Sequence, residues 1–368
     1  MIPHNQRAFD LLRSLVETES PSHDKSAVDK VGLLVAEECR RLGGDVEIVK
    51  QAEVGDHLLA KWGTGTGGIL LLHHMDTVFP IGTLAKMPFF QKDDKTFGPG
   101  VLDMKGGIVT TLSAIRKLLE SSQMPARRIT ALFTSDEEIG SDTSRALIEN
   151  LARESTLALV LESGLVDGAL KVWRKGVGEY QVTVKGRASH AGGAHEDGRN
   201  AIQEMSHQVL AIQSMTDYSK GTTLNVGIIK GGTASNVVPE ACEALVDYRV
   251  LVPEEAERVD AAMKSLSPIM PGTSVTVAGG LNRPPMPNNE VMKKTYEKAC
   301  RIAESIGLTL KSGGSGGGSD ANFVAALGVP VLDGLGTFGE GYHSEREYMF
   351  TDSLFTRAEL VAALIRKW

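Results

Sequence analysis

Histidine and carboxylate side chains follow three short apolar runs of the chain, at residues 69–72, 129–133 and 157–161. The runs lack strict alternation, which is typical of strands covered on both faces of a mostly parallel sheet. The side chains that follow them are His73, His74, Asp76, Asp136, Glu137, Glu138 and Glu162. Ligands of open α/β sheets bind outside the carboxyl ends of the strands, so these residues are expected to meet at one sheet edge.

A further acid, Asp103, lies in the glycine-rich segment 98–107. Several carboxylates in one crevice repel each other unless cations are present, and a divalent metal is the simplest remedy. With imidazoles from His74 and His343 the ligand set mixes nitrogen and oxygen, which suits zinc, with cobalt or manganese as substitutes. The sequence therefore predicts a metal site built from histidine and carboxylate.

Each of these residues also has an ordinary interpretation when taken alone. Asp103 could cap the N-terminus of a helix. Glu137 and Glu138 could be a solvated helix start, where acidic side chains favour the helix dipole. A functional site is favoured because all these residues are expected at the same sheet edge.

His73 and His74 compete for the role of metal ligand. Successive residues of a strand point to opposite faces, so only one of the two can be a ligand. We prefer His74, because Asp76 faces the same way and could fix the tautomer of its ring.

Helices and strands must alternate to position these residues. Apolar residues at helical spacing predict helices at 8–16, 28–42 and 104–120. Helices between buried strands imply right-handed crossovers and a doubly wound, mostly parallel sheet, so the fold class is α/β. We expect this catalytic, zinc-binding domain to comprise residues 1–175 and 286–368. Its second part would contain a helix at 290–306, an ordered Gly/Ser loop at 312–319, a strand at 329–332 and a final helix.

Residues 176–285 have a different pattern and are predicted to form an inserted domain. The expected strands are 180–184, 222–229, 242–250 and 274–278, and the expected helices are 200–215 and 253–266. This β-α-β-β-α-β order is the ferredoxin-like α+β unit, with one sheet face exposed or paired with a partner. The proline-rich segment 282–289 would be the linker back to the first domain.

Composition and net charge exclude some classes of binding partner. The chain has 368 residues, 42% of them hydrophobic, and a net charge of −7, so a sequence-independent grip on nucleic acid or a membrane surface is not expected. No apolar run reaches the roughly 18 residues that span a bilayer. Three scattered cysteines indicate neither a disulfide framework nor a cysteine-based zinc site. A cytoplasmic protein with a small-molecule partner is therefore expected.

Several motifs occur in an order that resembles the di-zinc carboxypeptidase and aminoacylase family over residues 8–366. They are His74-Met75-Asp76, Gly98-Pro99-Gly100, Asp103-Met104-Lys105-Gly106-Gly107, Asp136-Glu137-Glu138-Ile139-Gly140-Ser141, Glu162, Arg187-Ala188-Ser189-His190-Ala191-Gly192, Asn236-Val237-Val238-Pro239, Gly316-Gly317-Gly318-Ser319-Asp320 and Tyr342-His343-Ser344. Within that family the chain most resembles bacterial glutamate carboxypeptidases of the folate-cleaving type.

The resemblance implies two zinc ions per chain, with Asp103 bridging them. His74 and Glu162 would complete the site of one ion, and Glu138 and His343 that of the other. Two metals would lower the pKa of a bridging water and polarise the amide carbonyl.

The resemblance also implies roles for residues that hold no metal. Glu137 would be the general base and Asp76 the orienting carboxylate behind the metal ligands. His190, in the inserted domain, would reach the active site of a partner subunit and stabilise the oxyanion, so a homodimer through that domain is expected. Implied substrate contacts are Asn236, Arg283, Gly317 and Ser319.

The expected activity is hydrolysis of an amide bond next to a free carboxylate, in a small peptide, a folate-like conjugate or an N-acyl amino acid. Ser163 follows Glu162 where the folate-cleaving enzymes have proline, which leaves a preference for C-terminal glutamate open. One alternative is an N-acyl amino acid deacylase of the same family. Another is a serine α/β-hydrolase using Ser315, Asp320 or Asp333, and His343. A third is a binding protein without activity.

Overall fold

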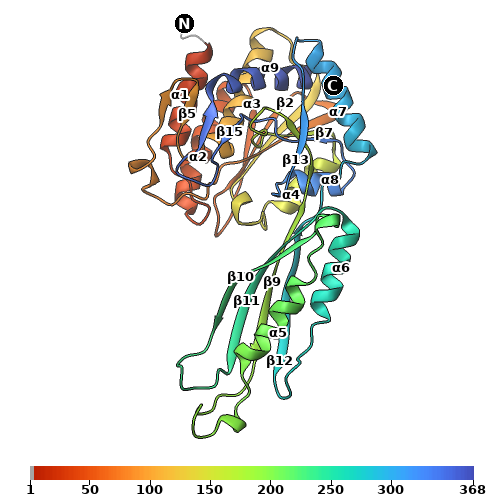
Figure 1. The fold of residues 1–368 in the computed structure, drawn as a ribbon. Helices are drawn as coiled ribbons and strands as arrows, with labels where there is room; N and C mark the ends of the chain where they lie inside the picture. Colours follow the sequence, from red (N-terminus) through yellow and green to blue (C-terminus); the bar gives the residue numbers. More distant parts are fainter. Residues whose placement is uncertain (1–3) are drawn as a thin grey trace. The chain divides into compact units, whose positions relative to one another are not determined.

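The computed structural model describes residues 4–368 of the chain. The chain forms two units, which are drawn in Figure 1. Unit 1 comprises the chain up to Trp173 together with Asn288–Ser315 and Ser319–Trp368. Unit 2 comprises Arg174–Pro287 and also takes Gly316–Gly318 from the glycine-rich segment near the C-terminus.

A six-stranded sheet forms the centre of unit 1. Its strand order is β1 (Asp45–Val49), β2 (His57–Trp62), β6 (Arg127–Thr134), β3 (Gly65–His74), β7 (Ser155–Val160) and β14 (Val331–Leu332). β3 pairs in parallel with β6 and β7, and β7 in parallel with β14, whereas β1 and β2 extend one edge antiparallel. The predicted α/β fold with a mostly parallel sheet is confirmed.

The antiparallel edge of this sheet did not show in the sequence pattern. β1 is exposed or half-buried along its length, so it has no buried apolar run. Its partner β2 is mostly buried, but it is short and contains the polar residues His57 and Lys61. Tertiary pairing, rather than local composition, makes these segments strands.

Helices pack on the sheet of unit 1 (Figure 1). They are α1 (His4–Glu17), α2 (Lys25–Arg41), α3 (Gly106–Glu120), α4 (Arg145–Arg153), α7 (Glu290–Glu304), α8 (Ala321–Ala326) and α9 (Thr351–Lys367). The apolar faces of α1, α2, α3, α7 and α9 share one core with β3, β6 and β7. The predicted helix at 104–120 begins later than expected, because Asp103 and Met104 have non-helical backbone angles.

Gly107 brings the start of α3 against the end of β7. A Cβ atom on Gly107 would lie 2.1 Å from the carbonyl oxygen of Leu161, closer than any side chain tolerates. Leu161 directly precedes Glu162, and Asp103 lies just before α3. The bare backbone of Gly107 therefore allows the segments that carry these two acids to approach each other.

Two smaller sheets complete unit 1. One contains β4 (Phe90–Lys92), β5 (Lys95–Phe97), β15 (Gly339–Glu340) and β16 (Tyr348–Phe350), and the other pairs β8 (Leu170–Arg174) with β13 (Ser312–Ser315). β13 corrects the expectation that 312–319 is all loop. A Cβ on Gly314 would lie 1.8 Å from the indole of Trp173, so glycine is what lets this strand pass over the ring.

Unit 2 contains an antiparallel sheet with two helices on one face. The elements are β9 (Gly176–Lys185), α5 (Ala201–Gln213), β10 (Thr223–Gly231), β11 (Ala241–Val250), α6 (Pro253–Lys264) and β12 (Ser274–Arg283). The sheet order β10-β11-β9-β12 and the β-α-β-β-α-β sequence confirm the predicted inserted α+β fold. β12 runs through Arg283, so the first residues of the expected linker belong to a strand.

One face of the unit 2 sheet packs on its helices and the other is open. Tyr180, Val182 and Val246 lie in the core beneath α5 and α6. On the edge strand β10, Ile228 and Ile229 are 48% and 51% exposed. Exposed apolar side chains on a sheet edge are typical of a surface that another strand or subunit covers.

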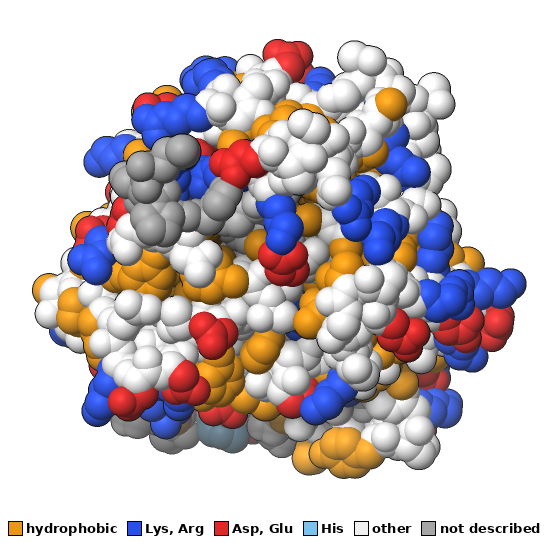
Figure 2. All heavy atoms as spheres, turned by 90° about the horizontal axis from the view of Figure 1, so that it is seen from above, with side chains coloured by type: hydrophobic (Ala, Val, Ile, Leu, Met, Phe, Trp, Pro, Cys, Tyr) orange, Lys and Arg blue, Asp and Glu red, His pale blue; other side chains and the backbone are white. Residues whose placement is uncertain are grey.

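Figure 2 shows acidic and basic side chains intermixed with apolar ones over the face of the molecule that it presents. Among the described residues of that face, no broad area carries one charge sign. The helices of residues 4–368 include none long and apolar enough to cross a membrane.

The buried Glu204 of α5 provides a test of what holds unit 2 together. Its carboxylate accepts hydrogen bonds from the backbone N–H groups of Ile269 and Met270 and from Gln208 and Thr273. Burial opposes ionisation, but these donors together lower the pKa of Glu204 below its ordinary value. Its contribution to stability is therefore present above the unfolded-state pKa and is lost as the pH falls through the folded-state pKa.

We predict that Glu204→Gln lowers the free energy of unfolding of unit 2 by about 1–3 kcal/mol at pH 7, because donors that faced a carboxylate lose an acceptor. Hydrogen exchange in 266–273 should accelerate, and the difference from the unmodified chain should shrink below about pH 4. Glu243→Gln, at an exposed position on β11, is the control. Equal exchange in both variants would contradict the prediction.

Candidate metal centre

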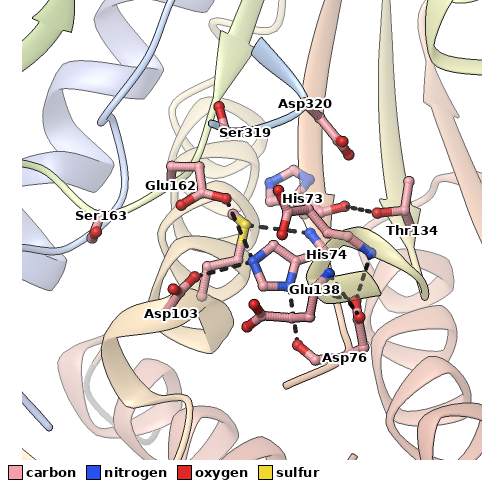
Figure 3. Close-up of polar contacts among 12 residues, drawn as sticks. His73, His74, Asp76, Asp103, Thr134, Glu138, Glu162, Ser163, Ser319 and Asp320 are labelled. Atoms are coloured by element: carbon pink, nitrogen blue, oxygen red, sulfur yellow. Dashed lines mark hydrogen bonds and ion pairs between the residues drawn. The ribbon is translucent and has the colours of Figure 1, made fainter. Parts of the chain in front are cut away.

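His74 ends β3 with its ring buried beside two acids (Figure 3). Its Nε2 lies 3.1 Å from Oδ1 of Asp103 and 3.5 Å from Oε1 of Glu162. Its Nδ1 lies 3.0 Å from the carbonyl oxygen of Asp76, which can only accept a hydrogen bond. Nδ1 therefore carries the proton, and Nε2 is the nitrogen that faces the acids.

Asp103 lies between two histidines. Its Oδ1 faces His74, and its Oδ2 is 3.2 Å from Nε2 of His343, which also lies 3.3 Å from Oε2 of Glu138. Two groups of potential ligands thus share Asp103: His74, Asp103 and Glu162 form one, and Asp103, Glu138 and His343 the other. Within each group the ligand atoms lie within 4.8 Å of one another.

The charges in this cluster shift the pKa values of its members. Hydrogen bonds to Asp103 and Glu138 raise the pKa of His343 to about 11. Burial and the charge of Asp103 raise the pKa of Glu138 to about 7. For Asp103, burial favours the neutral acid, but hydrogen bonds from His343 and His74 hold its pKa well below the usual range. The carboxylates of this cluster therefore favour the binding of a proton or another cation among them.

The ligand set fits a divalent metal. Imidazole nitrogens and carboxylate oxygens are ligands that zinc accepts, and manganese and cobalt sites use the same types. Oε1 of Glu138 is buried without a hydrogen-bond partner, which is costly unless a cation occupies the space beside it.

His73 faces away from the cluster, as the strand alternation predicted. Its ring stacks on Phe133, and its nitrogens lie 3.2 Å from the carbonyl oxygen of Leu132 and 2.8 Å from Oγ1 of Thr111. Burial lowers the pKa of His73 to about 3, so it is neutral. His73 is therefore a core residue.

The side chain of Asp76 accepts hydrogen bonds from the backbone that follows strand β6. Its carboxylate oxygens accept hydrogen bonds from the N–H groups of Glu137 and Glu138, at 3.3 and 3.2 Å, and from the hydroxyl of Ser22 at 2.7 Å. The carboxylate is farther from His74 Nδ1, at 3.5 Å, than the Asp76 carbonyl oxygen is. The expected fixing of the tautomer thus comes from the backbone of Asp76, and its side chain orients the turn that carries Glu137 and Glu138.

That turn is held from its other side by Asp136. Oδ2 of Asp136 accepts from the backbone N–H groups of Thr143 and Ser144 and from the hydroxyl of Thr143. Glu137 is half-buried and begins the short helix Glu137–Ile139, next in sequence to Glu138. Glu137 therefore lies in the same short turn as Glu138.

His190 and Asn236 meet in unit 2. The backbone N–H of Ala191 donates to the carbonyl oxygen of Asn236 at 2.9 Å. Nδ1 of the exposed His190 accepts from the N–H groups of Gly192 and Gly193, at 3.1 and 3.0 Å. The proton of a neutral His190 ring therefore lies on Nε2, which makes this ring a hydrogen-bond donor toward solvent.

The remaining residues expected to contact substrate are engaged inside their own units. Arg283 is buried at the end of β12, and its guanidinium donates to Oδ1 of Asn282 at 2.9 Å. The carbonyl oxygen of Gly317 accepts from Arg174 at 3.2 Å. Ser319 is buried, and its hydroxyl donates to Asp333 at 3.3 Å. Their substrate contacts stay predictions.

The serine hydrolase alternative lacks its catalytic contacts. His343 pairs with Asp103 and Glu138, not with Asp320 or Asp333. Asp320 instead accepts from the hydroxyl of Ser141 at 2.6 Å. The acids that a triad would need are thus not bonded to His343 in the described part of the chain.

Sequence reasoning missed Glu347, a buried carboxylate behind Asp103. It accepts hydrogen bonds from the backbone N–H groups of Gly100, Leu102 and Asp103. The one sequence signal that distinguishes Glu347 from the exposed Glu345 two residues earlier is the apolar run 348–350 that directly follows Glu347.

Comparison with known proteins identifies relatives over nearly the whole chain. The chain is 36% identical to carboxypeptidase G2 from Pseudomonas sp. (strain RS-16), over 96% of this chain and 87% of that protein. The structure of aminopeptidase PepT from Bacillus cereus matches with a TM-score of 0.77 and 25% identity, covering 98% of each chain. The YXEP protein of Bacillus subtilis, described as a dinuclear metal binding peptidase, matches in fold with a TM-score of 0.68 and 15% identity, over 99% of this chain and 98% of that one.

The model of the peptidase family M20/M25/M40 matches residues 70–367, a span that contains all the potential metal ligands described above. A family match of this extent, together with the relative at 36% identity, decides the assignment. The chain is a member of the M20/M25/M40 peptidase family and a metallohydrolase related to carboxypeptidase G2.

Proposed function

We propose that this protein is a di-zinc hydrolase that cleaves the amide bond beside a free carboxylate, in small peptides, folate-like conjugates or N-acyl amino acids. The observation that carries the proposal is the sharing of Asp103, whose two carboxylate oxygens face His74 and His343 from opposite ends. A carboxylate held in this way suits a ligand common to two ions. Zinc is the metal proposed, and cobalt or manganese would suit the same ligands.

Bound metals would supply a Lewis acid that lowers the pKa of a water molecule and polarises the scissile carbonyl. Glu137 would accept the proton of that water and return it to the leaving nitrogen. The hydrogen bonds of Asp76 to the backbone of Glu137 and Glu138 support this role, since they hold the base and a ligand in one turn.

Substrate recognition would involve a cavity of unit 1 together with the residues that the family resemblance implies. A cavity of about 580 Å³ lies in unit 1, between the segment after Glu162 and the segment before His343. Its walls include Leu165 and Tyr342, which offer apolar contact, and the charged residues Lys171, Arg346 and Glu340. Arg283, Asn236, Gly317 and Ser319 are the further substrate contacts proposed.

A second subunit would complete the active site. His190 presents an Nε2–H donor, the group that stabilisation of an oxyanion needs. The open sheet face and the exposed Ile228 and Ile229 of unit 2 support a homodimer through this unit. We therefore propose that His190 acts in the active site of its partner.

A hydrolysis panel tests the proposed activity. We predict turnover of dipeptides, aroyl-glutamates or N-acyl amino acids that is lost with a chelator and regained when zinc is added, with no effect of a serine-directed phosphonate. Each substrate is paired with its C-terminal amide, and a preference for the acid would support carboxylate recognition, for which Arg283 is the proposed anchor. Activity that survives metal removal would contradict the proposal, and failure to turn over any substrate would favour a binding protein.

Substitution of the neighbouring acids separates the base from the ligand. We predict that Glu137→Gln keeps two zinc ions per chain but lowers kcat by about a hundred- to ten-thousand-fold, because proton transfer is lost. Glu138→Gln should instead weaken the binding of one ion. Elemental analysis and kcat are measured for both, with Asp142→Asn, at an exposed position in the same turn, as the control. Equal loss of metal in both variants would remove Glu137 as the base.

Mixing two inactive variants tests the proposed exchange of His190 between subunits. His190→Ala and Glu137→Gln dimers should each be inactive, but a mixed dimer would contain one site with both residues intact. Random exchange should therefore restore about a quarter of the unmodified rate. If subunits exchange, as shown by a mass tag, and no activity returns, His190 does not act across the dimer.

A further inference from the structure

Glu347 is a fully buried carboxylate that lies against the backbone of the segment that carries Asp103. Its Oε1 is 2.7 Å from the backbone nitrogen of Leu102 and 3.1 Å from that of Asp103, and its Oε2 is 3.2 Å from that of Gly100. Three N–H groups of one short loop therefore converge on a single side chain. The carboxyl group of Glu347 is thus the common hydrogen-bond acceptor of this loop.

The loop needs this support because its backbone is irregular. Gly100 has a φ of 73°, and Asp103 has φ −120° and ψ 95°, outside the helical range although α3 begins three residues later. N–H groups of such a loop have no helical acceptor and need another partner when buried. The direction of the Asp103 side chain follows from this backbone, so the acceptor that fixes the loop also fixes the carboxylate.

Glu347 also belongs to the segment that carries His343. His343 has a φ of 60°, and the turn around it is closed by hydrogen bonds from the Ser344 N–H to the Gly341 carbonyl and from the Glu347 N–H to the Ser344 carbonyl, each 3.1 Å. Glu347 is thus tied through the chain to His343 and through hydrogen bonds to Asp103.

We propose that Glu347 is a positioning residue that sets the separation of Asp103 and His343 and so builds the second of the two metal sites. The inference rests on the proposed di-metal function. Glu162 and His74 are attached to strands β7 and β3 of the central sheet and do not depend on this link. Loss of the Glu347 contacts should therefore affect the site of Asp103, Glu138 and His343 more than the site of His74, Asp103 and Glu162.

Glu347→Gln is the sharpest test, because it keeps the shape of the side chain and replaces one acceptor oxygen with an NH₂ group that cannot accept. The metal-free chain is titrated with zinc, and metal content is measured after dialysis. We predict one ion bound as in the unmodified chain, and a second with a dissociation constant raised about tenfold to a hundredfold. The value of kcat should fall at limiting zinc and recover when zinc is raised, with less change in KM.

Glu345→Gln is the matched control, since Glu345 is exposed on the same segment and its substitution should leave both sites unchanged. Glu347→Asp serves if the Gln variant does not fold, because the shorter side chain keeps the carboxyl group but cannot span all three N–H groups. The thermal unfolding of each variant is recorded in the metal-free state, so that a general loss of stability is separated from a selective loss of one ion.

The zinc titration separates failure of the proposed di-metal function from failure of the proposed role of Glu347. If the unmodified chain binds no more than one zinc ion, the proposed di-metal function fails. If the unmodified chain binds two ions and the folded Glu347 variants bind both equally well, Glu347 has no positioning role. Weakening of both ions to the same extent would also overturn the proposal, because it would indicate a general structural role.

Discussion

Repulsion between carboxylates is the constraint on which the rest of this structure depends. Asp76, Asp103, Glu138 and Glu162 gather at one edge of a sheet, all of them largely out of solvent. Two unit charges 4 Å apart interact by about 4 kcal/mol at an effective dielectric constant of about 20. Without metal, protonated His74 and His343 supply the opposing charge, because the neighbouring acids raise the pKa of both rings. The same excess of negative charge favours the binding of divalent ions.

The surrounding fold holds these acids together through the backbone. Gly107 lets two acid-bearing segments approach, while Asp76 and Asp136 each accept from backbone N–H groups around the turn of Glu137. Glu347 does the same for the loop of Asp103. Acidic side chains have two different roles here: some face the metal site, and others accept hydrogen bonds from the loops that carry the first group. The precision of the cluster therefore comes from N–H groups as much as from side-chain packing.

The sequence predicts where the buried strands end but not which distant segments contact each other. Uninterrupted apolar runs are typical of buried strands, so they predict β3, β6 and β7 and, directly after them, His74, Glu138 and Glu162. The sequence placed Asp103 and His343, 240 residues apart, in one set of ligands, but only the family resemblance paired them at the same ion, because local periodicity carries no information about partners. β1 was missed because it is largely exposed, and Glu347 because an acid beside Glu345 looks like an ordinary surface residue until its burial is known.

The division of the chain into units has a consequence for how unit 2 could be isolated. Because Gly316–Gly318 belong to unit 2, the backbone crosses between the units at residues 173–174, 287–288, 315–316 and 318–319. The carbonyl oxygens of Gly317 and Gly318 accept hydrogen bonds from the guanidinium of Arg174, so this glycine segment is held by unit 2. The chain therefore enters and leaves unit 2 twice. Unit 2 cannot be excised as one continuous segment, because excision of residues 174–287 alone would leave residues 316–318 behind.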